Sequence, residues 1–322
     1  MDINSSYIHN SSQGSNKTMV TAFILLGFQG PINIRMLLFI LFLVVYCMTI
    51  CGNLLIITLV SSNKNLHSPM YFFLTQLSMS DIIIATDVVP YMLHILLNGE
   101  GNITFIGCIT QLYFFSATET SDCLILTVMA YDRYVAICKP LHYVSIMNNA
   151  HCMKLAILSW ALSFSIILIN TITTSMLQFC GSNIIDHFFC DLVPLLELSC
   201  SDTRIVQLEV SLISAPVLII PIIIIIVSYS NILLTVLTSS SNTVRQKAFS
   251  TCSSHLTVVF IFYWTLFGVY ALPTKGLSLS ISKSLSIIYT VLTPLLNPVI
   301  YSLRNKDIKK ALRKTVYKNV FL

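Results

Sequence analysis

Apolar residues gather into seven long runs along the chain, separated by short polar segments. The runs span 36–60, 69–97, 107–137, 153–175, 205–238, 248–272 and 283–303. Each run has the ~20 residues that a helix needs to cross the hydrocarbon core of a bilayer. A lone segment in lipid must satisfy its own backbone hydrogen bonds, and a helix does so. We therefore expect an all-α membrane protein built as a bundle of seven transmembrane helices.

A shorter, amphipathic helix is predicted after the last run, within 305–318. Ile308, Leu312 and Val316 recur there at helical spacing, opposite four lysines. Such a helix would lie on the inner leaflet, with its apolar face in the headgroup region. The alternative is a frayed basic tail.

Composition supports a membrane location. Hydrophobic residues make up 55% of the 322 residues and charged residues only 10%, whereas soluble domains have about a quarter of their residues charged. The net charge of +5 is therefore interpreted as membrane topology and attraction to anionic lipid rather than as nucleic-acid binding.

The distribution of basic residues predicts the orientation. If the N-terminus is outside, thirteen Lys and Arg residues fall in the inner loops and tail and five on the outer side, as the positive-inside rule requires. The chain then divides into an extracellular segment 1–35, the bundle 36–304 and a cytoplasmic tail 305–322. No cleaved signal peptide is visible, so the first helix is expected to direct insertion.

Two further features fit this orientation. Four Asn-x-Ser/Thr sequons, which are glycosylated only on the lumenal side, fall on the predicted outer side at Asn4, Asn10, Asn16 and Asn102. Four of the ten cysteines also fall there, where disulfides persist, and they allow three pairings: Cys108, Cys180, Cys190 and Cys200. The chain has no CxxC pair, so a zinc site is not expected.

Acidic residues inside the predicted helices are the main candidates for chemistry. A charge at the bilayer centre costs at least ~2.5 kcal/mol, so each should face the bundle interior or water. Asp81 and Asp122 would repel one another across one cavity. Either one of them is protonated, with ordered water, or a sodium ion lies between them.

Several segments in order carry a resemblance to a known family. They are LHSPMYFFL at 66–74, MAYDRYVAICKPLHY at 129–143, KAFSTCSSHL at 247–256 and PLLNPVIYSLRN at 294–305, preceded by FILLGF at 23–28. Together they resemble the odorant receptors of the rhodopsin-like class, in the tetrapod-type branch. The resemblance covers nearly the whole chain. Each proline taken alone would be an ordinary helix kink.

The resemblance implies roles for residues at the inner side and for the cysteines. Arg133 would be the switch that meets a G protein, with Tyr229 and Tyr301 closing on it in the active state. Cys108 would pair with Cys190, and Cys180 with Cys200. The implied switch residues are Asp132, Arg133, Tyr134, Tyr229, Asn297, Pro298 and Tyr301.

The resemblance also implies a ligand pocket in the outer half of the bundle. An apolar lining with a few polar groups suits a small, volatile, mostly hydrophobic ligand. Glu119 would favour an amine if charged; otherwise it is a neutral acid bonded to nearby hydroxyls or part of the Asp81–Asp122 network. The expected pocket residues are Phe115, Ser116, Glu119, Thr120, Ile213, Ser214, Val217, Tyr263, Leu266, Phe267 and Tyr270.

Two positions depart from the family pattern. The family usually has glutamate where this chain has Asp122, and the shorter side chain weakens the case for sodium. Trp264 stands where the family often has glycine, so it either narrows the cavity or faces lipid.

The resulting hypothesis is a multi-pass plasma-membrane odorant receptor that activates the stimulatory olfactory G protein and raises cyclic AMP. No enzyme motif or cofactor is expected, apart from the sodium ion considered above. No lysine lies near the centre of the last run, which argues against bound retinal. The rival hypothesis is a transporter or channel using Asp81, Glu119 and Asp122, although LILTVM at 124–129 is too apolar to continue an ion path. A receptor for a metabolite outside the nose is the nearer alternative.

Overall fold

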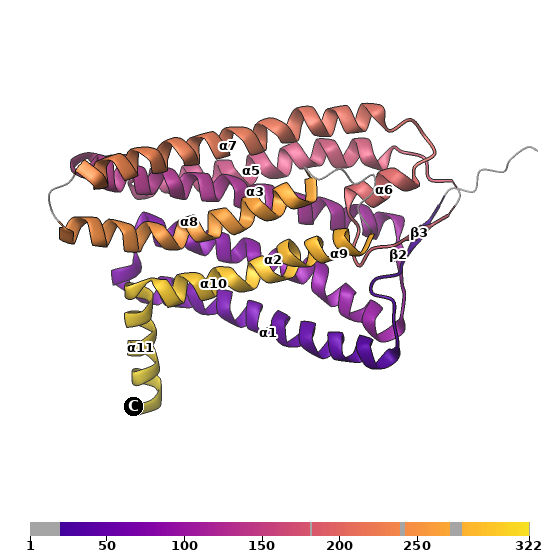
Figure 1. Cartoon of the computed structure of the whole chain (residues 1–322), viewed down its shortest axis with the longest axis horizontal. Helices are drawn as coiled ribbons and strands as arrows, with labels where there is room; N and C mark the ends of the chain where they lie inside the picture. Colours follow the sequence, from indigo (N-terminus) through magenta and orange to yellow (C-terminus); the bar gives the residue numbers. More distant parts are fainter. Residues whose placement is uncertain (1–19, 181, 239–241, 271–278, 322) are drawn as a thin grey trace, which may run out of the picture.

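A computed structural model describes residues 20–180, 182–238, 242–270 and 279–321. Seven long helical spans form the bundle in these ranges, as predicted, and each begins and ends within about six residues of its apolar run (Figure 1). The last span is interrupted by a π-helical turn, η3. The spans are α1 (Ile32–Ser62), α2 (Pro69–Asn98), α3 (Phe105–Cys138), α5 (Asn149–Ser175), α7 (Arg204–Thr238), α8 (Asn242–Tyr270), and α9 (Leu279–Ile287) followed by η3 (Ile288–Leu292) and α10 (Thr293–Arg304).

Five of these spans are long and apolar enough to cross a membrane by length and composition alone, among the residues described. The span α3 is more polar because it contains Glu119, Asp122, Asp132 and Arg133. In α8 the apolar stretch found among the described residues is shorter, Cys252–Leu266. The polarity of α3 follows from its place in the bundle, because Glu119, Asp122 and Asp132 are buried between other helices rather than exposed to lipid.

The surface of the bundle is apolar, as lipid contact requires. Leu37 and Ile40 of α1 and Ile226 of α7 each have more than half of their side chain exposed. Trp264 is 65% exposed and stacks on the exposed Phe260, with ring centroids 5.8 Å apart. Of the two interpretations of Trp264, the structure supports the one in which the side chain points outward from the bundle.

A small sheet at one end of the bundle was not predicted from the sequence. Strand β1 (Ala22–Leu25) pairs with β2 (Gly101–Thr104) in the antiparallel direction and with β3 (Ile184–Ile185) in the parallel direction. Alternate residues Phe23 and Leu25 are fully buried. The segment before α1 therefore helps to cover this end of the bundle (Figure 1, right). This cover, made of β1, β2, β3 and the residues that lead from β3 to Asp191, is called the roof below.

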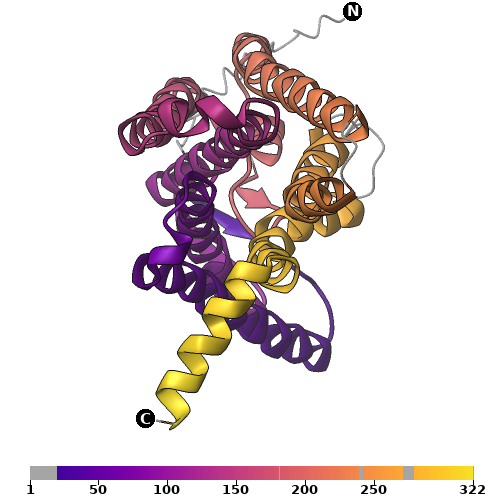
Figure 2. The ribbon, with the colours of Figure 1, turned by 90° about the vertical axis from the view of Figure 1, so that its left-hand side faces the viewer.

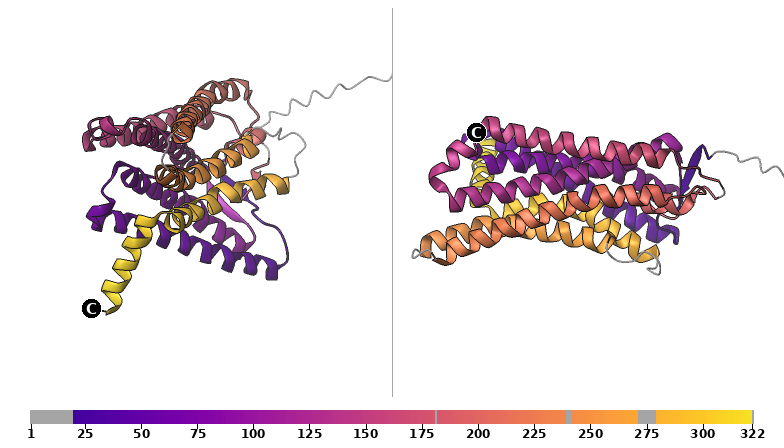
Figure 3. Two further views of the ribbon diagram at one scale, coloured as in Figure 1. Left: turned by 60° about the vertical axis from the view of Figure 1, so that its left-hand side comes forward. Right: turned by 90° about the horizontal axis from the view of Figure 1, so that it is seen from above.

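The end of the bundle opposite the roof, called the inner end from here on, carries two short helices; the half nearer the roof is called the outer half. Helix α4 (Tyr143–Ile146) lies in the connection from α3 to α5. Helix α11 (Lys306–Phe321) turns sharply away from α10 (Figures 1 and 3). Ile308 is buried while Lys309 and Lys310 are exposed, so the first turns of α11 are amphipathic, as predicted; the side chain of Val316 lies outside the described residues.

Seen along its long axis, the bundle has its helices arranged around one another, with α11 leading away from them (Figure 2). A helix α6 (Leu192–Leu198) lies under the roof, in the long connection between α5 and α7. The described chain begins at the roof and ends in α11 at the other end of the bundle, as an odd number of crossings requires.

Candidate functional site

A cavity of about 410 Å³ lies in the half of the bundle nearer the roof. Its walls come from α3, α5, α7, the start of α6 and one residue of α8. Most lining groups are apolar or hydroxyl-bearing, the pattern of a small-molecule site. The lining residues are Leu112, Ser116, Glu119, Thr120, Cys123, Ile166, Ile167, Asn170, Thr171, Thr174, Asp191, Leu192, Val210, Ser211, Ala215, Val217, Leu218 and Leu266.

The stripe from α3 follows helical geometry. Ser116, Glu119 or Thr120, and Cys123 are three, four or seven residues apart, so they lie on one face of the helix. The Cys123 thiol also lies 3.0 Å from the Tyr263 hydroxyl and 3.4 Å from the Val217 carbonyl oxygen. These contacts join α3 to α7 and α8 at the floor of the cavity.

The roof over the cavity is held by covalent and ionic links. Disulfides join Cys108 to Cys190 and Cys180 to Cys200, the pairs implied by the resemblance. The Lys283 ammonium donates to Asp186 Oδ1 at 2.5 Å and to the Gly27 carbonyl oxygen at 2.7 Å. The start of the last span, the long connection and the segment before α1 therefore meet at one point.

His187 is buried within this roof. Its ring stacks on Phe188 and lies edge-on to Phe189, with ring centroids 4.7 and 4.8 Å apart. Burial, together with the nearby Lys283 ammonium, lowers the pKa of His187 to about 3. The imidazole is therefore neutral at physiological pH and acts as a packing group.

Asp191 ends the roof and begins α6. Its Oδ1 accepts a hydrogen bond from the Leu192 amide at 2.7 Å, and Tyr289 places its hydroxyl 3.5 Å from Oδ2. Burial raises the pKa of Asp191 above its ordinary value. The carboxyl group is thus both a helix cap and a polar group in the cavity wall.

A second polar cluster lies deeper, at the middle of the bundle. The Asn297 amide donates to both carboxylate oxygens of Asp81, at 2.9 and 3.1 Å. Asp122 is also buried, and its Oδ1 has no hydrogen-bond partner in the structure. On α1, the Asn53 amide donates to the Pro294 carbonyl oxygen at 3.0 Å, so α1, α2 and α10 are joined through side chains.

The third cluster is at the inner end of α3. Arg133 forms an ion pair with the adjacent, buried Asp132, and Arg133 Nε lies 2.8 Å from Asp132 Oδ2. The Tyr143 hydroxyl of α4 donates to Asp132 Oδ1 at 2.8 Å. The Tyr229 hydroxyl of α7 lies 2.5 Å from His255 Nδ1 of α8.

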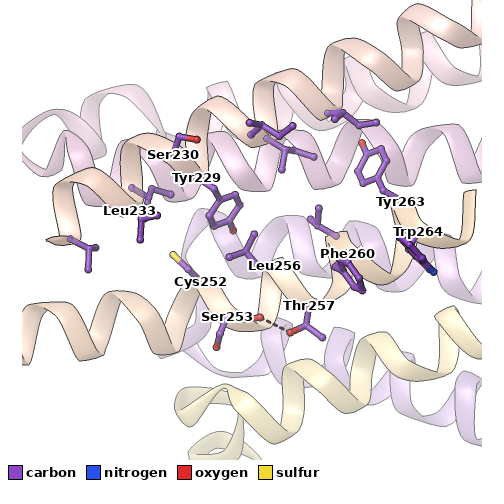
Figure 4. Close-up of a pocket in the computed structure, with 16 residues that line it drawn as sticks. Tyr229, Ser230, Leu233, Cys252, Ser253, Leu256, Thr257, Phe260, Tyr263 and Trp264 are labelled. Carbon is purple, nitrogen blue, oxygen red and sulfur yellow. Dashed lines mark hydrogen bonds between the residues drawn. The ribbon is translucent and has the colours of Figure 1, made fainter. Parts of the chain in front are cut away.

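An apolar groove of about 950 Å³ runs between α7 and α8 in the inner half (Figure 4). Leu233 lies at one end of it, Tyr229 and Cys252 follow, and Tyr263 and Trp264 lie at the other end. The inner halves of α7 and α8 are therefore not closely packed against each other along this groove.

Comparison with known proteins identifies the family. The family model described as "Olfactory receptor" matches residues 42–319. Human Olfactory receptor 6B1 is 46% identical over 302 residues, which cover 94% of this chain and 96% of that protein. Mouse Olfactory receptor 5G9 is 46% identical over 308 residues, covering 95% and 98%. This chain belongs to the olfactory receptor family.

The fold agrees with that membership. Squid rhodopsin superposes with a TM-score of 0.72 at 15% identity, covering 90% of this chain and 87% of that structure. The olfactory receptor is thus a rhodopsin-like seven-helix protein, a multi-pass plasma-membrane receptor that signals through a heterotrimeric G protein, and not an enzyme.

The cavity of the receptor contains part of the predicted pocket. Ser116, Glu119, Thr120, Val217 and Leu266 line it. The side chains of Ser214, Phe267 and Tyr270 lie outside the described residues, as do Asn4, Asn10 and Asn16. Asn102 lies on β2 and is exposed.

Three predicted pocket residues do not line the cavity. Phe115 is turned one position around α3 from Ser116 and packs on Phe189 and Tyr289. Ile213 is offset from the stripe of α7 that faces the cavity. Tyr263 lies below the floor and lines the inner groove.

The structure adds residues that the sequence did not indicate. Asn170, Thr171 and Thr174 of α5 line the cavity, and a weak amphipathic pattern in a mostly apolar run gave little reason to select them. Asp191 follows Cys190 directly, so its place depends on the disulfide to α3. Among the described residues, neither Tyr229 nor Tyr301 is hydrogen-bonded to Arg133, and the buried Tyr301 hydroxyl has no hydrogen-bond partner.

Proposed function

We propose that this olfactory receptor binds a small, volatile, mostly hydrophobic odorant in the 410 Å³ cavity and activates a stimulatory G protein, which raises cyclic AMP. The roof then faces the extracellular side, and Arg133 and α11 face the cytoplasm. The observation that carries the proposal is a cavity at one end of the bundle and the Asp132–Arg133 pair at the other end of the same helix, α3.

The structure supports a route between the two ends. Leu266 of α8 lines the cavity, and His255 on the same helix contacts Tyr229 of α7 near the inner side. A ligand that binds one arrangement of α8 better than another shifts the population toward it. The inner ends of α7 and α8 would then move away from α3, exposing Arg133 to the G protein.

A sodium ion between Asp81 and Asp122 is part of the proposal. The two buried carboxyl groups and the unpartnered Asp122 Oδ1 provide oxygen ligands of the kind that hard cations prefer. The ion would neutralise the two carboxylates and stabilise one arrangement of the bundle. Replacing sodium by choline in the assay buffer should change basal cyclic AMP; a response that depends on pH but not on sodium would assign a proton to this position instead.

The main test is a cyclic AMP assay in cells that express the receptor, with a chemically broad odorant panel. Leu266→Trp should fill the cavity and abolish the response to an active odorant. Leu212→Trp, on the exposed face of α7, is the matched control and should respond normally. Ion flux without cyclic AMP, in cells lacking G-protein signalling, would support the transporter or channel instead.

A further inference from the structure

Two carboxyl groups from different parts of the chain line the same cavity. Glu119 comes from the middle of α3, and Asp191 from the end of the roof. Their positions are fixed independently, because Glu119 belongs to a long helix and Asp191 caps α6 next to the Cys108–Cys190 disulfide. The fold therefore places two acidic groups in the wall of the same cavity.

No protein cation balances these two groups. Among the residues that the structure describes, none lining the cavity is Lys, Arg or His. Lys283 lies on the same side of the bundle, but its ammonium donates to Asp186 and to the Gly27 carbonyl oxygen. Arg204 is exposed, and the acidic residue near it is Asp202.

The wall of the cavity also has oxygen atoms that lack hydrogen-bond donors. Asn170 is 8% exposed, and its side-chain oxygen has no partner in the structure. Glu119 is 9% exposed and lines the cavity, and no hydrogen bond joins its carboxyl group to another described residue. Buried acceptors without donors are costly, and the cost is greater for charged groups. The described lining residues thus provide acceptors and acidic groups, and a ligand that is a positively charged donor would complement both.

We propose that the odorant of this receptor is a small aliphatic amine, whose ammonium group lies between Glu119 and Asp191 and whose alkyl chain packs on the apolar wall. An ammonium has three donors and no acceptor, which matches in number the two carboxyl groups and the Asn170 oxygen that line the cavity. Ile166, Ile167 and Leu218 supply apolar surface for the alkyl chain. This inference names the ligand class of the proposed odorant site and rests on that function.

The competing account is a neutral, protonated Glu119. A buried carboxyl group that lacks donors is less costly protonated than charged, so Glu119 becomes a carboxylate only when a cationic ligand supplies the donors, and a neutral odorant would leave it protonated. A neutral odorant with a hydroxyl group could donate to only one of the unpartnered oxygens. The number and type of free acceptors therefore favour the ammonium.

The experiment compares straight-chain amines, from butylamine to octylamine, with alcohols of the same length in the cyclic AMP assay. Variants Glu119→Gln, Glu119→Asp and Asp191→Asn are measured beside Glu197→Gln, an exposed acidic residue of α6 that serves as the control. An epitope tag before residue 20 reports the amount of receptor at the surface. The readout is the ratio of half-maximal concentrations for amine and for a neutral agonist.

We expect at least one amine to activate the wild type, and Glu119→Gln to raise the amine-to-neutral ratio by ten- to a hundredfold, since a charged hydrogen bond is lost. Glu119→Asp should raise it less, and Glu197→Gln should not change it. If Asp191→Asn fails to reach the surface, the Glu119 variants still decide. Neutral odorants that signal while every amine is inactive, or an unchanged ratio in Glu119→Gln, overturn the inference but not the proposed function. If the receptor reaches the cell surface and no odorant activates it, the proposed function itself is overturned.

Discussion

Buried polar side chains in this receptor are held in groups that connect helices. Asp81, nearly inaccessible to solvent, accepts two hydrogen bonds from the Asn297 amide. Asn53 joins α1 to α10 in the same region. Because unpaired polar groups are expensive in this environment, the groups set the relative positions of the helices as well as their own conformations.

Replacing Asn297 by leucine should destabilise the receptor. Asp81 would lose its only side-chain donors among the described residues, and an unsatisfied buried acceptor costs about 1–3 kcal/mol. The melting temperature of the detergent-purified protein should fall by several degrees. The exchange Asp81→Asn with Asn297→Asp retains one donor and one acceptor and should recover part of the loss. A melting temperature equal to wild type in Asn297→Leu would contradict the assigned role.

His187 should make the receptor less stable in mild acid. Its pKa is lowered to about 3 in the folded protein, while an unfolded histidine has a pKa of about 6.5. Below pH 6.5 the unfolded state binds a proton that the folded state does not. The free energy of unfolding therefore decreases as the pH is lowered, by about 2 kcal/mol between pH 6.5 and 5. The groups facing the ring are Asp186, Phe188, Phe189 and Lys283.

Melting curves at several pH values provide the measurement. His187→Phe should flatten the pH dependence by this amount, and His94→Gln, at an exposed position of α2, should leave it unchanged. A pH dependence identical in wild type and His187→Phe would remove His187 as its source.

For single residues, the prediction of the cavity lining succeeded where the positions follow the repeat of a helix. Ser116, Glu119 and Thr120 line the cavity because residues three and four apart on α3 share a face. Phe115 was included with them and packs elsewhere, since a shift of one residue turns a side chain by about 100° around the helix. Asp191 and His187 were missed because a loop held by a disulfide has no periodic pattern.

The helices themselves follow from apolar length, but their junctions depend on details that length does not contain. Gly52 of α1 faces Pro298 of α10, where a Cβ atom built on the glycine would lie 3.2 Å from the proline Cγ. The π-helical turn at Ile288–Leu292 interrupts a run that the sequence predicted as one helix. The three-stranded sheet joins β1 to segments about 80 and 160 residues further along the chain, and no local pattern indicates such pairing.

Enlarging Gly52 should separate α1 from α10. Gly52→Ala should be tolerated with a small loss, because the proline ring can shift by a few tenths of an ångström. Gly52→Val adds branched methyl groups and should cost about 1–3 kcal/mol through overpacking, with a marked drop in surface display by flow cytometry. Leu54→Val, on an exposed face of α1, is the control. Equal display of the Val and Ala variants at position 52 would argue against close contact here.

On the scale of the whole molecule, the receptor has a ligand cavity near the roof and an ion pair at the inner end, with α3 running between them. The inner pair is supported from another element, because Tyr143 of α4 donates to Asp132. Burial, and next the Asp132 carboxylate, raise the pKa of Tyr143, so the hydroxyl keeps its proton. Tyr143, in the connection between α3 and α5, therefore binds the same Asp132 carboxylate as Arg133.

Tyr143→Phe should raise basal signalling. The hydrogen bond to a charged carboxylate is worth about 1.5–3 kcal/mol, and part of it stabilises the arrangement in which Asp132 holds Arg133. Basal cyclic AMP per displayed receptor should increase several-fold. Tyr113→Phe removes a hydroxyl contact to the Phe164 carbonyl oxygen in the outer half and should leave basal cyclic AMP unchanged. Basal signalling that is the same in both variants would sink the idea that Tyr143 restrains the switch.

The parallel pairing of β1 with β3 has a consequence for building chimaeras between relatives. Main-chain bonds such as the one from the Ile24 amide to the Asn183 carbonyl oxygen, 2.9 Å long, make the junction, and they are indifferent to side-chain identity. The segment before α1 can therefore be exchanged between family members, and at equal length it should still pair with β2 and β3. Inserting a single residue between Phe23 and Leu25 would place these two side chains on opposite faces of the sheet, so one of them would turn outward and the exchanged segment would lose half of its buried anchor.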